Sequence, residues 1–199
     1  MRVSGVILSG GRSSRMEQNK AFVKVGGKRI IDIIIDRLSQ HFDDIVIITN
    51  QPELYQDLGV KVASDIIPHQ GPLSGLHAGL VHTGGDAIFA VACDMPFIDM
   101  DLAFYMIDIL QGYHVVVPLV KGRFQPLFAV YDRSCLPIFE DCLLHGRLKV
   151  SRVYQEELIV KYISHEEVAR FGDAEVIFCN VNSPENLRKA LEIAKKVII

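Results

Sequence analysis

The residues best suited to chemistry lie near the start of the chain, directly after a short apolar run. Val6–Leu8 is followed by Ser9-Gly10-Gly11-Arg12-Ser13-Ser14-Arg15 and then by Lys20. Glycines let a backbone approach a phosphate closely, and consecutive N–H groups in such a loop converge on its oxygens. The glycine pair alone would also suit an ordinary turn. Together with the nearby cations, which make strong charge-assisted bonds, it predicts a phosphate-binding loop.

Two better-known phosphate loops do not fit this chain. The first apolar run is not followed by GxGxxG, and Gly26-Gly27-Lys28-Arg29 lacks both the upstream glycine and the Ser or Thr of a P-loop. The sequence therefore argues against a dinucleotide-dependent dehydrogenase and against a P-loop ATPase.

A second candidate is Asp94, which follows the apolar run Ala87–Cys93. If that run is a strand parallel to the first, Asp94 lies at the same edge of the sheet as the glycine loop, where ligands bind. Mg²⁺ needs only one or two carboxylates when phosphate oxygens and water complete its shell. Asp94 could equally be a turn or cap residue. For Asp99-Met100-Asp101 we favour an ordinary helix start.

Two further groups of polar residues follow apolar segments. Asp65 follows Val60–Ala63 and precedes Gly71-Pro72-Leu73-Ser74-Gly75, whose turn residues could wrap one side of a nucleotide. Asn180 and Asn182 are two residues apart, so a strand would present both amides on one face. The alternative for Asp65 and the Gly71–Gly75 segment is an ordinary loop. The alternative for Asn180 and Asn182 is an Asx turn.

The first half of the chain alternates apolar runs with helical periodicity. We expect strands over residues 3–8, 45–49, 60–63 and 87–93, and helices over residues 30–42 and 76–81. Such alternation is typical of βαβ units with parallel strands and right-handed crossovers. The expected fold is therefore α/β, a three-layer α/β/α sandwich with a Rossmann-like, mostly parallel sheet.

The second half is predicted to add helices and strands of mixed direction. We expect helices over residues 99–110, 133–144, 150–156 and 184–196, the last capped by Ser183 and opened by Pro184. We expect strands over residues 115–117, 127–131, 161–163 and 176–181. The strand at 127–131 follows Gln125-Pro126 and is expected to be an added strand of mixed direction.

Composition limits the remaining possibilities. The chain has 199 residues, of which 49% are hydrophobic and 23% charged, with a net charge of −3, so we expect one globular domain over residues 1–199. Lys and Arg form no cluster longer than a pair, which argues against nucleic-acid and membrane partners. The longest apolar run is far shorter than the roughly 20 residues of a membrane span, and the first residues lack a secretory pattern. We therefore expect a cytoplasmic protein.

Cysteine and histidine spacing argues against a resident metal or redox centre. The four cysteines form no CxxC pair and are expected to be buried reduced thiols. The histidines are not spaced for a shared metal and are expected to be solvated or half-buried; they are His69, His77 and His82.

Five motifs, taken in chain order, resemble those of molybdenum cofactor guanylyltransferases, within the nucleotidyltransferase superfamily. They are Leu8-Ser9-Gly10-Gly11 with Arg15-Met16 and Lys20, Gly71-Pro72-Leu73-Ser74-Gly75, Cys93-Asp94-Met95-Pro96, Gln125-Pro126-Leu127-Phe128-Ala129, and Asn180-Val181-Asn182-Ser183-Pro184-Glu185. The resemblance implies one Mg²⁺-dependent nucleotidyltransferase domain. It implies transfer of GMP from GTP to molybdopterin-bound molybdenum, with release of pyrophosphate, and transient contacts with other cofactor-biosynthesis proteins.

The resemblance also implies a role for each matching residue. The residues expected to bind GTP are Leu8, Ser9, Gly10, Gly11, Lys20, Asn50, Asp65, Gly71 and Asp94. Of these, Asn50 and Asp65 would lie along the guanosine. Lys20 and Arg15 would neutralise the phosphates, and Asp94 would also hold Mg²⁺. Asn180 and Asn182 would face the pterin.

One residue departs from the pattern, and two alternative functions stay open. The family usually has glycine after Arg-Met, whereas this chain has Glu17, so the geometry between Arg15 and Lys20 is not fixed by the resemblance. A related nucleotidyltransferase that uses CTP or another acceptor is the first alternative function. A nucleotide-binding regulator without turnover is the second.

Overall fold

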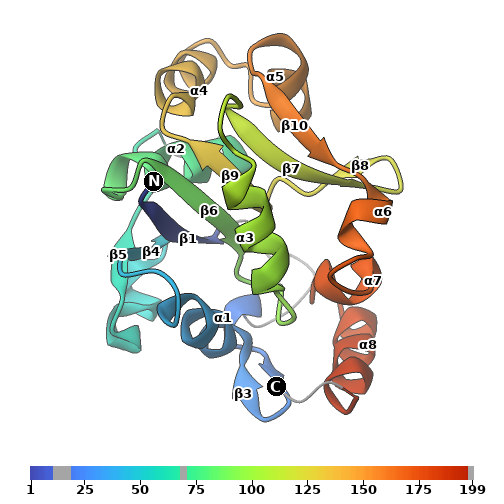
Figure 1. The fold of residues 1–199 in the computed structure, drawn as a ribbon. Helices are drawn as coiled ribbons and strands as arrows, with labels where there is room; N and C mark the ends of the chain where they lie inside the picture. The colour runs from blue at the N-terminus through green and yellow to red at the C-terminus, as the bar shows by residue number, and fades with distance from the viewer. Residues whose placement is uncertain (11–18, 68–70, 197–199) are drawn as a thin grey trace.

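The chain folds around one large sheet, and the computed structural model describes residues 1–10, 19–67 and 71–196. The sheet has eight strands in the order β10-β7-β9-β6-β1-β4-β5, with β8 paired to β7 (Figure 1). The strands are β1 (Val3–Ser9), β4 (Ile45–Thr49), β5 (Lys61–Ala63), β6 (Ala87–Ala92), β7 (Val115–Val120), β8 (Arg123–Phe124), β9 (Phe128–Asp132) and β10 (Val160–Ile163).

Strand direction brings four strand ends to one edge of the sheet. The strand β1 is parallel to both of its neighbours, β4 and β6, and β5 is parallel to β4. In the register, Ser9 lies beside Thr49 and Leu8 lies beside Ala92. The strand β9 runs antiparallel to β6 and β7, which confirms the predicted mixed direction. Loops that follow β1, β4, β5 and β6 therefore meet at this edge.

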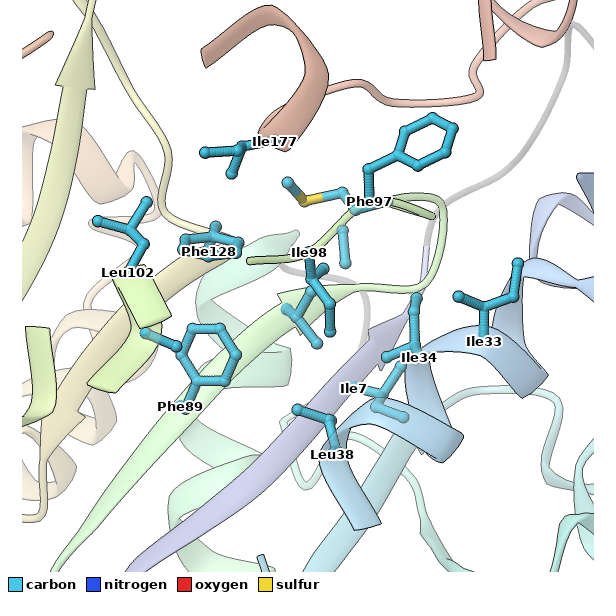
Figure 2. Packing of buried hydrophobic residues seen from close by; sticks show 14 of the residues in the cluster. Ile7, Ile33, Ile34, Leu38, Phe89, Phe97, Ile98, Leu102, Phe128 and Ile177 are labelled. Atoms are coloured by element: carbon cyan, nitrogen blue, oxygen red, sulfur yellow. The ribbon is translucent and has the colours of Figure 1, made fainter. Parts of the chain in front are cut away.

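Helices cover both faces of the sheet and make three layers, as predicted. One face is covered by α1 (Ile30–Ser39), α3 (Met100–Asp108), α7 (Ala174–Ile177) and α8 (Pro184–Ala194), and α6 (His165–Val168) packs into the same core. The other face is covered by α2 (Pro72–His82), α4 (Cys135–Leu144) and α5 (Val150–Glu156). Figure 2 shows the first core, which includes Ile7 and Phe89 from the sheet, Leu38 from α1 and Ile177 from α7.

The central strands are buried on both sides. Along β1, Ile7 belongs to the α1–α3 core, whereas Val6 and Leu8 belong to the α2–α4 core. Alternate residues of a strand point to opposite faces, so a strand between two helical layers needs apolar residues at every position. This explains why the runs at residues 3–8 and 87–93 read as continuous rather than alternating.

Two glycines let α2 lie unusually close to β1. A Cβ on Gly75 would be 2.9 Å from Leu8 Cδ2, and a Cβ on Gly79 would be 2.8 Å from Val6 Cγ1. Both distances are shorter than van der Waals contact, so these glycines set the separation between helix and sheet. The second glycine of the Gly-Pro-Leu-Ser-Gly motif thus has a packing role.

We expect Gly79→Ala to lower the free energy of unfolding. Crowding of about 1–3 kcal/mol should exceed the gain of about 1 kcal/mol that alanine brings to a helix, leaving a net loss of about 1–2 kcal/mol. Chemical denaturation measures the change. Gly172→Ala is the matched control, because its Cβ would be 3.5 Å from Ile177 Cδ1, an ordinary contact. Equal stability of the two variants would contradict the packing role.

A small hairpin was not predicted. The strands β2 (Lys24–Val25) and β3 (Lys28–Arg29) pair antiparallel around Gly26 and Gly27, whose φ values are 61° and 89°. Positive φ at both central positions favours glycine. From the sequence we compared this segment only with a P-loop, which it does not match. Its glycine pair is, however, a signal for a β-hairpin.

The strand predicted over residues 176–181 is wrong. The segment Ala174–Ile177 is the short helix α7, and Cys179–Asn182 is in neither helix nor strand. Asp173 caps this helix, since its side chain accepts a hydrogen bond from the Glu175 N–H at 2.8 Å. A short apolar run does not by itself distinguish a strand from a helix, and here the cap decides.

Two other expectations can be compared with the structure. The four cysteines are free thiols, and three of them are buried, as predicted. None of the helices over residues 1–10, 19–67 and 71–196 is long and apolar enough to span a membrane.

Candidate functional site

The glycine loop begins where β1 meets β6. The Cys93 N–H donates a hydrogen bond to the Leu8 carbonyl at 3.1 Å, so Ser9 and Cys93 leave the sheet next to each other. Ser9 is buried at the strand end, and Gly10 is exposed. The chain continues from β1 to β4 on one side and returns to β6 on the other, and ligand crevices form where the strand order reverses in this way.

Three segments that are distant in sequence converge beside this point. The Lys20 Nζ donates a hydrogen bond to Asn182 Oδ1, and the Val181 N–H donates to the Asp94 carbonyl at 2.9 Å. Burial raises the pKa of Asp94, and the positive charge of Lys20 acts in the opposite direction. The structure therefore brings together Lys20, Asp94 and Asn182.

The predicted face shared by two asparagines does not form, because the strand that would create it is absent. Asn180 is half-buried, and its Nδ2 donates to the Phe178 carbonyl at 3.2 Å. Asn182 is exposed and holds the ammonium of Lys20. Of the pair, Asn182 is thus the one that lies at the convergence point.

The single carboxylate at this edge suits a cation whose other ligands are phosphate oxygens and water. Within the described residues, groups of three or more His, Cys, Asp or Glu side chains that could hold a metal are absent. Asp94 is half-buried, and burial disfavours its charged form. A carboxylate in that state gains from a nearby cation. One carboxylate fits Mg²⁺ bound mainly by phosphate oxygens and water.

A second pair of predicted residues meets at the ends of β4 and β5. The Asn50 Nδ2 donates to Asp65 Oδ2 at 3.0 Å. Asn50 is exposed and Asp65 is half-buried. The Asn50 amide therefore holds one oxygen of a carboxylate that solvent can still reach. Gly71 then precedes α2 with a φ of 73°, a conformation that glycine adopts without strain. Asn50 and Asp65 are therefore brought together as expected.

Tyr55 was not anticipated from the sequence. It is fully buried, and its hydroxyl is hydrogen-bonded to the Ser9 hydroxyl and accepts from Asn19 Nδ2 at 2.9 Å. Burial raises its pKa, so the phenol stays neutral. Asn19 in turn caps the 3₁₀ helix Lys20–Phe22 by accepting from the Ala21 N–H at 3.1 Å. Tyr55 thereby fixes the end of β1 relative to the turn that carries Lys20.

We expect Tyr55→Phe to destabilise the protein. The ring packing survives, but the Ser9 hydroxyl and the Asn19 amide lose a buried partner, at about 1–3 kcal/mol of unfolding free energy. Urea denaturation measures the change in unfolding free energy. Tyr113→Phe is the control, because Tyr113 is exposed and its change should stay within about 0.5 kcal/mol. If Tyr55→Phe is as stable as the control, the Tyr55 hydroxyl does not hold the end of β1 against the turn that carries Lys20.

Cys93 lies beside the candidate site but is a poor nucleophile. Burial raises the pKa of its thiol to about 12. The thiolate is the reactive form of cysteine, and this thiol is protonated near neutral pH. Burial therefore argues against Cys93 as a nucleophile.

Some predicted residues fall outside the described ranges, and one histidine differs from expectation. Gly11, Arg12, Arg15 and Glu17 lie outside the described residues, as does His69. His77 is buried in α2 rather than solvated, and burial lowers its pKa. Its Nδ1 has no hydrogen-bond partner among the described residues. Burial thus favours the neutral form of this imidazole.

Comparison with known proteins shows which family the chain belongs to. Residues 5–161 match the model of the MobA-like NTP transferase domain. The chain belongs to this family. A family relative from Pelotomaculum thermopropionicum, named a probable molybdenum cofactor guanylyltransferase, is 40% identical over 98% of this chain and 95% of its own length. The molybdenum cofactor guanylyltransferase of Desulfosudis oleivorans is 37% identical, over 94% of each chain. The resemblance in the motifs is confirmed.

Solved structures support the same family and fold. Molybdopterin-guanine dinucleotide biosynthesis protein A from Archaeoglobus fulgidus superposes with a TM-score of 0.84 and 26% identity, over 98% of this chain and 100% of the other. A CMP:2-keto-3-deoxy-manno-octonic acid synthetase complexed with CTP gives a TM-score of 0.75 at 15% identity, over 99% of this chain and 100% of the other. The second likeness concerns the fold alone, and it agrees with the predicted three-layer α/β sandwich.

Proposed function

We propose that this chain transfers GMP from GTP to molybdopterin-bound molybdenum, forming the guanine dinucleotide cofactor and pyrophosphate. The observation that carries the proposal is the convergence of Lys20, Asp94 and Asn182 where β1 and β6 end. Relatives that match nearly the whole chain bear the name of this activity. We also propose that residues 1–199 act as one domain, because Ala190 of α8 belongs to the same core as Ile7 of β1.

The protein's part in this reaction is alignment and charge neutralisation. An oxygen of the acceptor's terminal phosphate attacks the α-phosphorus of GTP and forms the new P–O bond. The bond to the bridging oxygen breaks, and its electron pair leaves with pyrophosphate. An anionic phosphate needs no further activation by a base, so positioning and electrostatic stabilisation supply the catalysis.

Each group at the edge has a proposed task in that step. The backbone of Leu8, Ser9, Gly10 and Gly11 would bind the phosphates, and Lys20 and Arg15 would offset their charge. Asn182 holds the Lys20 ammonium and would orient it, and we keep Asn180 with it on the acceptor side. Asp94 would hold Mg²⁺. When bound, this ion supplies Lewis-acid stabilisation of charge on phosphate oxygens.

Asp65 is our candidate for recognition of the guanine base, next to Asn50 and Gly71. A carboxylate accepts hydrogen bonds from guanine N1–H and N2–H, whereas the pairing edge of cytosine offers one amino group. The bond from Asn50 holds this carboxylate in place. If CTP is the true substrate, this complementarity is lost.

We expect Asp65→Asn to lower kcat/KM for GTP by about 5- to 150-fold, because a bidentate contact to a base contributes about 1–3 kcal/mol. The loss for CTP should be much smaller. Pyrophosphate release with each nucleotide measures both values. The control is Asp101→Asn, at an exposed position on α3. If the unaltered protein is more active with CTP than with GTP, the proposed guanylyl transfer is wrong and the protein transfers cytidylyl groups.

A second test separates the enzyme from a nucleotide-binding regulator. A regulator would bind GTP and Mg²⁺ without releasing pyrophosphate when the molybdopterin acceptor is added. We expect release that requires GTP and acceptor together, and binding without release would exclude the transferase.

A further inference from the structure

The Tyr55 hydroxyl contacts the chain next to two proposed phosphate ligands. It is hydrogen-bonded to the Ser9 hydroxyl and accepts from Asn19 Nδ2 at 2.9 Å. Ser9 and Gly10 belong to the backbone that is proposed to bind the phosphates, and Lys20 directly follows Asn19. One phenol therefore connects the end of β1, which provides backbone N–H groups, to the turn that provides a cation.

The ring of Tyr55 holds the same turn by packing. It lies against the Phe22 ring with centroids 5.1 Å apart, and Phe22 is the last residue of the 3₁₀ helix that begins at Lys20. The Arg29 guanidinium lies 5.5 Å from the centroid of the Phe22 ring. A change of Tyr55 to phenylalanine keeps this ring packing and removes only the bonds of the hydroxyl.

Burial makes the bonds of this hydroxyl persistent. Tyr55 is fully buried, Ser9 is buried, and Asn19 is half-buried. A buried polar group that loses its partner costs free energy, so these three groups favour staying together. Each bond joins protein groups, and the protein itself thus sets the spacing between Ser9 and Asn19.

Contacts on the guanosine side of the proposed site are made by different atoms. There the Asn50 Nδ2 donates to Asp65 Oδ2 at 3.0 Å. The Tyr55 hydroxyl, in contrast, bonds Ser9 and Asn19. Loss of this hydroxyl should therefore affect phosphate binding and spare binding of the base.

We propose that Tyr55 is a positioning residue for the triphosphate of GTP, because its hydroxyl keeps Ser9 and Lys20 at the spacing that binds phosphate. This inference rests on the proposed function. Apparent affinity falls when the arrangement that binds the ligand is populated less, and a site that is already arranged loses less entropy on binding. Tyr55 is fully buried, so it acts through Ser9 and Asn19.

The binding test uses Tyr55→Phe and ligands that contain different parts of GTP. Calorimetry with Mg²⁺ gives the Kd for GTP and for inorganic triphosphate, and we expect both to rise at least about fivefold. Guanosine lacks phosphate, so its occupancy, measured by saturation-transfer NMR, should stay within about twofold. An equal loss for guanosine and GTP would indicate a general disturbance of the site and would overturn the proposal.

Tyr154→Phe is the matched control for lost stability. Tyr154 is also buried, and its hydroxyl is hydrogen-bonded to Tyr131 in the core on the other face of the sheet. This variant loses the same group from a similarly buried ring, and its Kd for GTP should stay within about twofold of the unaltered protein's. The same rise in Kd for both variants would attribute the effect to stability and exclude a positioning role.

A double variant tests whether the effect passes through Ser9. Ser9→Ala removes the hydroxyl and leaves the backbone N–H in place. Ser9→Ala/Tyr55→Phe should bind GTP within about twofold of Tyr55→Phe alone, because both changes remove the same hydrogen bond. Losses that multiply in the double variant would show that the two hydroxyls act separately, contrary to the proposal.

Turnover separates failure of the positioning role from failure of the function. In Tyr55→Phe the KM for GTP should rise with the Kd, whereas kcat at saturating GTP should stay within about threefold. A fall in kcat with an unchanged KM would contradict the proposal. Normal pyrophosphate release with an unchanged Kd would overturn the role of Tyr55 and leave the function standing. If the unaltered protein releases no pyrophosphate, the function fails, and calorimetry still decides the role of Tyr55.

Discussion

The Asp94→Asn variant is expected to lose nearly all turnover while keeping its fold. Asparagine preserves the size and one carbonyl oxygen but removes the negative charge that favours a hard cation. Loss of a group that stabilises charge in the reaction typically lowers the rate about 10²- to 10³-fold, so we expect kcat to fall by at least about 10². Binding of metal-free GTP should change little. Pyrophosphate release at saturating GTP and acceptor measures the loss.

Stability provides the control for this substitution. Burial raises the Asp94 pKa in the folded protein above its ordinary value, so the folded state binds the proton more tightly than the unfolded chain does. The stability that this group contributes is therefore present at low pH and lost as pH rises through the carboxyl range. Removing the charge should leave the melting temperature at neutral pH unchanged or higher.

Asp99 is a matched control that distinguishes a metal-binding role of Asp94 from a helix-cap or turn role. Asp99 accepts a hydrogen bond from the Leu102 N–H at 2.8 Å and caps α3, and asparagine caps helices about as well. Asp99→Asn should therefore keep near-normal turnover. If Asp94→Asn also keeps it, Asp94 is a turn residue and does not hold the metal.

The second large effect is expected for Lys20→Ala. The substitution removes the Lys20 charge that acts on Asp94 and the hydrogen bond from Lys20 to Asn182. Loss of one charge-assisted phosphate contact should lower kcat/KM for GTP by about 1.5–3 kcal/mol, which is about 10- to 150-fold. The fold should persist, because Lys20 belongs to neither core.

Lys24→Ala is the control for Lys20, because Lys24 is exposed on β2 four residues further along. Its kcat/KM should match that of the unaltered protein. Steady-state kinetics with varied GTP compares the two variants. Equal values for Lys20→Ala and Lys24→Ala would exclude Lys20 from phosphate binding.

Sequence periodicity predicted strands that are buried on both sides and helices that bury one face. The strand Ile45–Thr49 and the helix Val150–Glu156 were predicted with the bounds that the structure shows. Parallel pairing of the early strands was also enough to place Lys20 and Asp94 at one edge. These predictions succeed because a continuous apolar run between two helical layers has few other solutions.

The failures arise where a contact or a single cap decides the structure. The role of Tyr55 depends on hydrogen bonds to Ser9 and Asn19, residues more than thirty positions away along the chain, and no local pattern signals them. The segment after Ala174 became helical through the cap at Asp173. The cytoplasmic location and the requirement for Mg²⁺ stay predictions.

The central claim is the transfer of GMP from GTP to the molybdopterin acceptor, and one measurement tests it directly. The purified protein is incubated with Mg²⁺, the acceptor and GTP labelled at the α-phosphate, and the label is followed together with free pyrophosphate. We expect label in a dinucleotide product in equal amount to pyrophosphate, and only when GTP and acceptor are both present. Label that stays in GTP, or that leaves as GMP without joining the acceptor, would contradict the account.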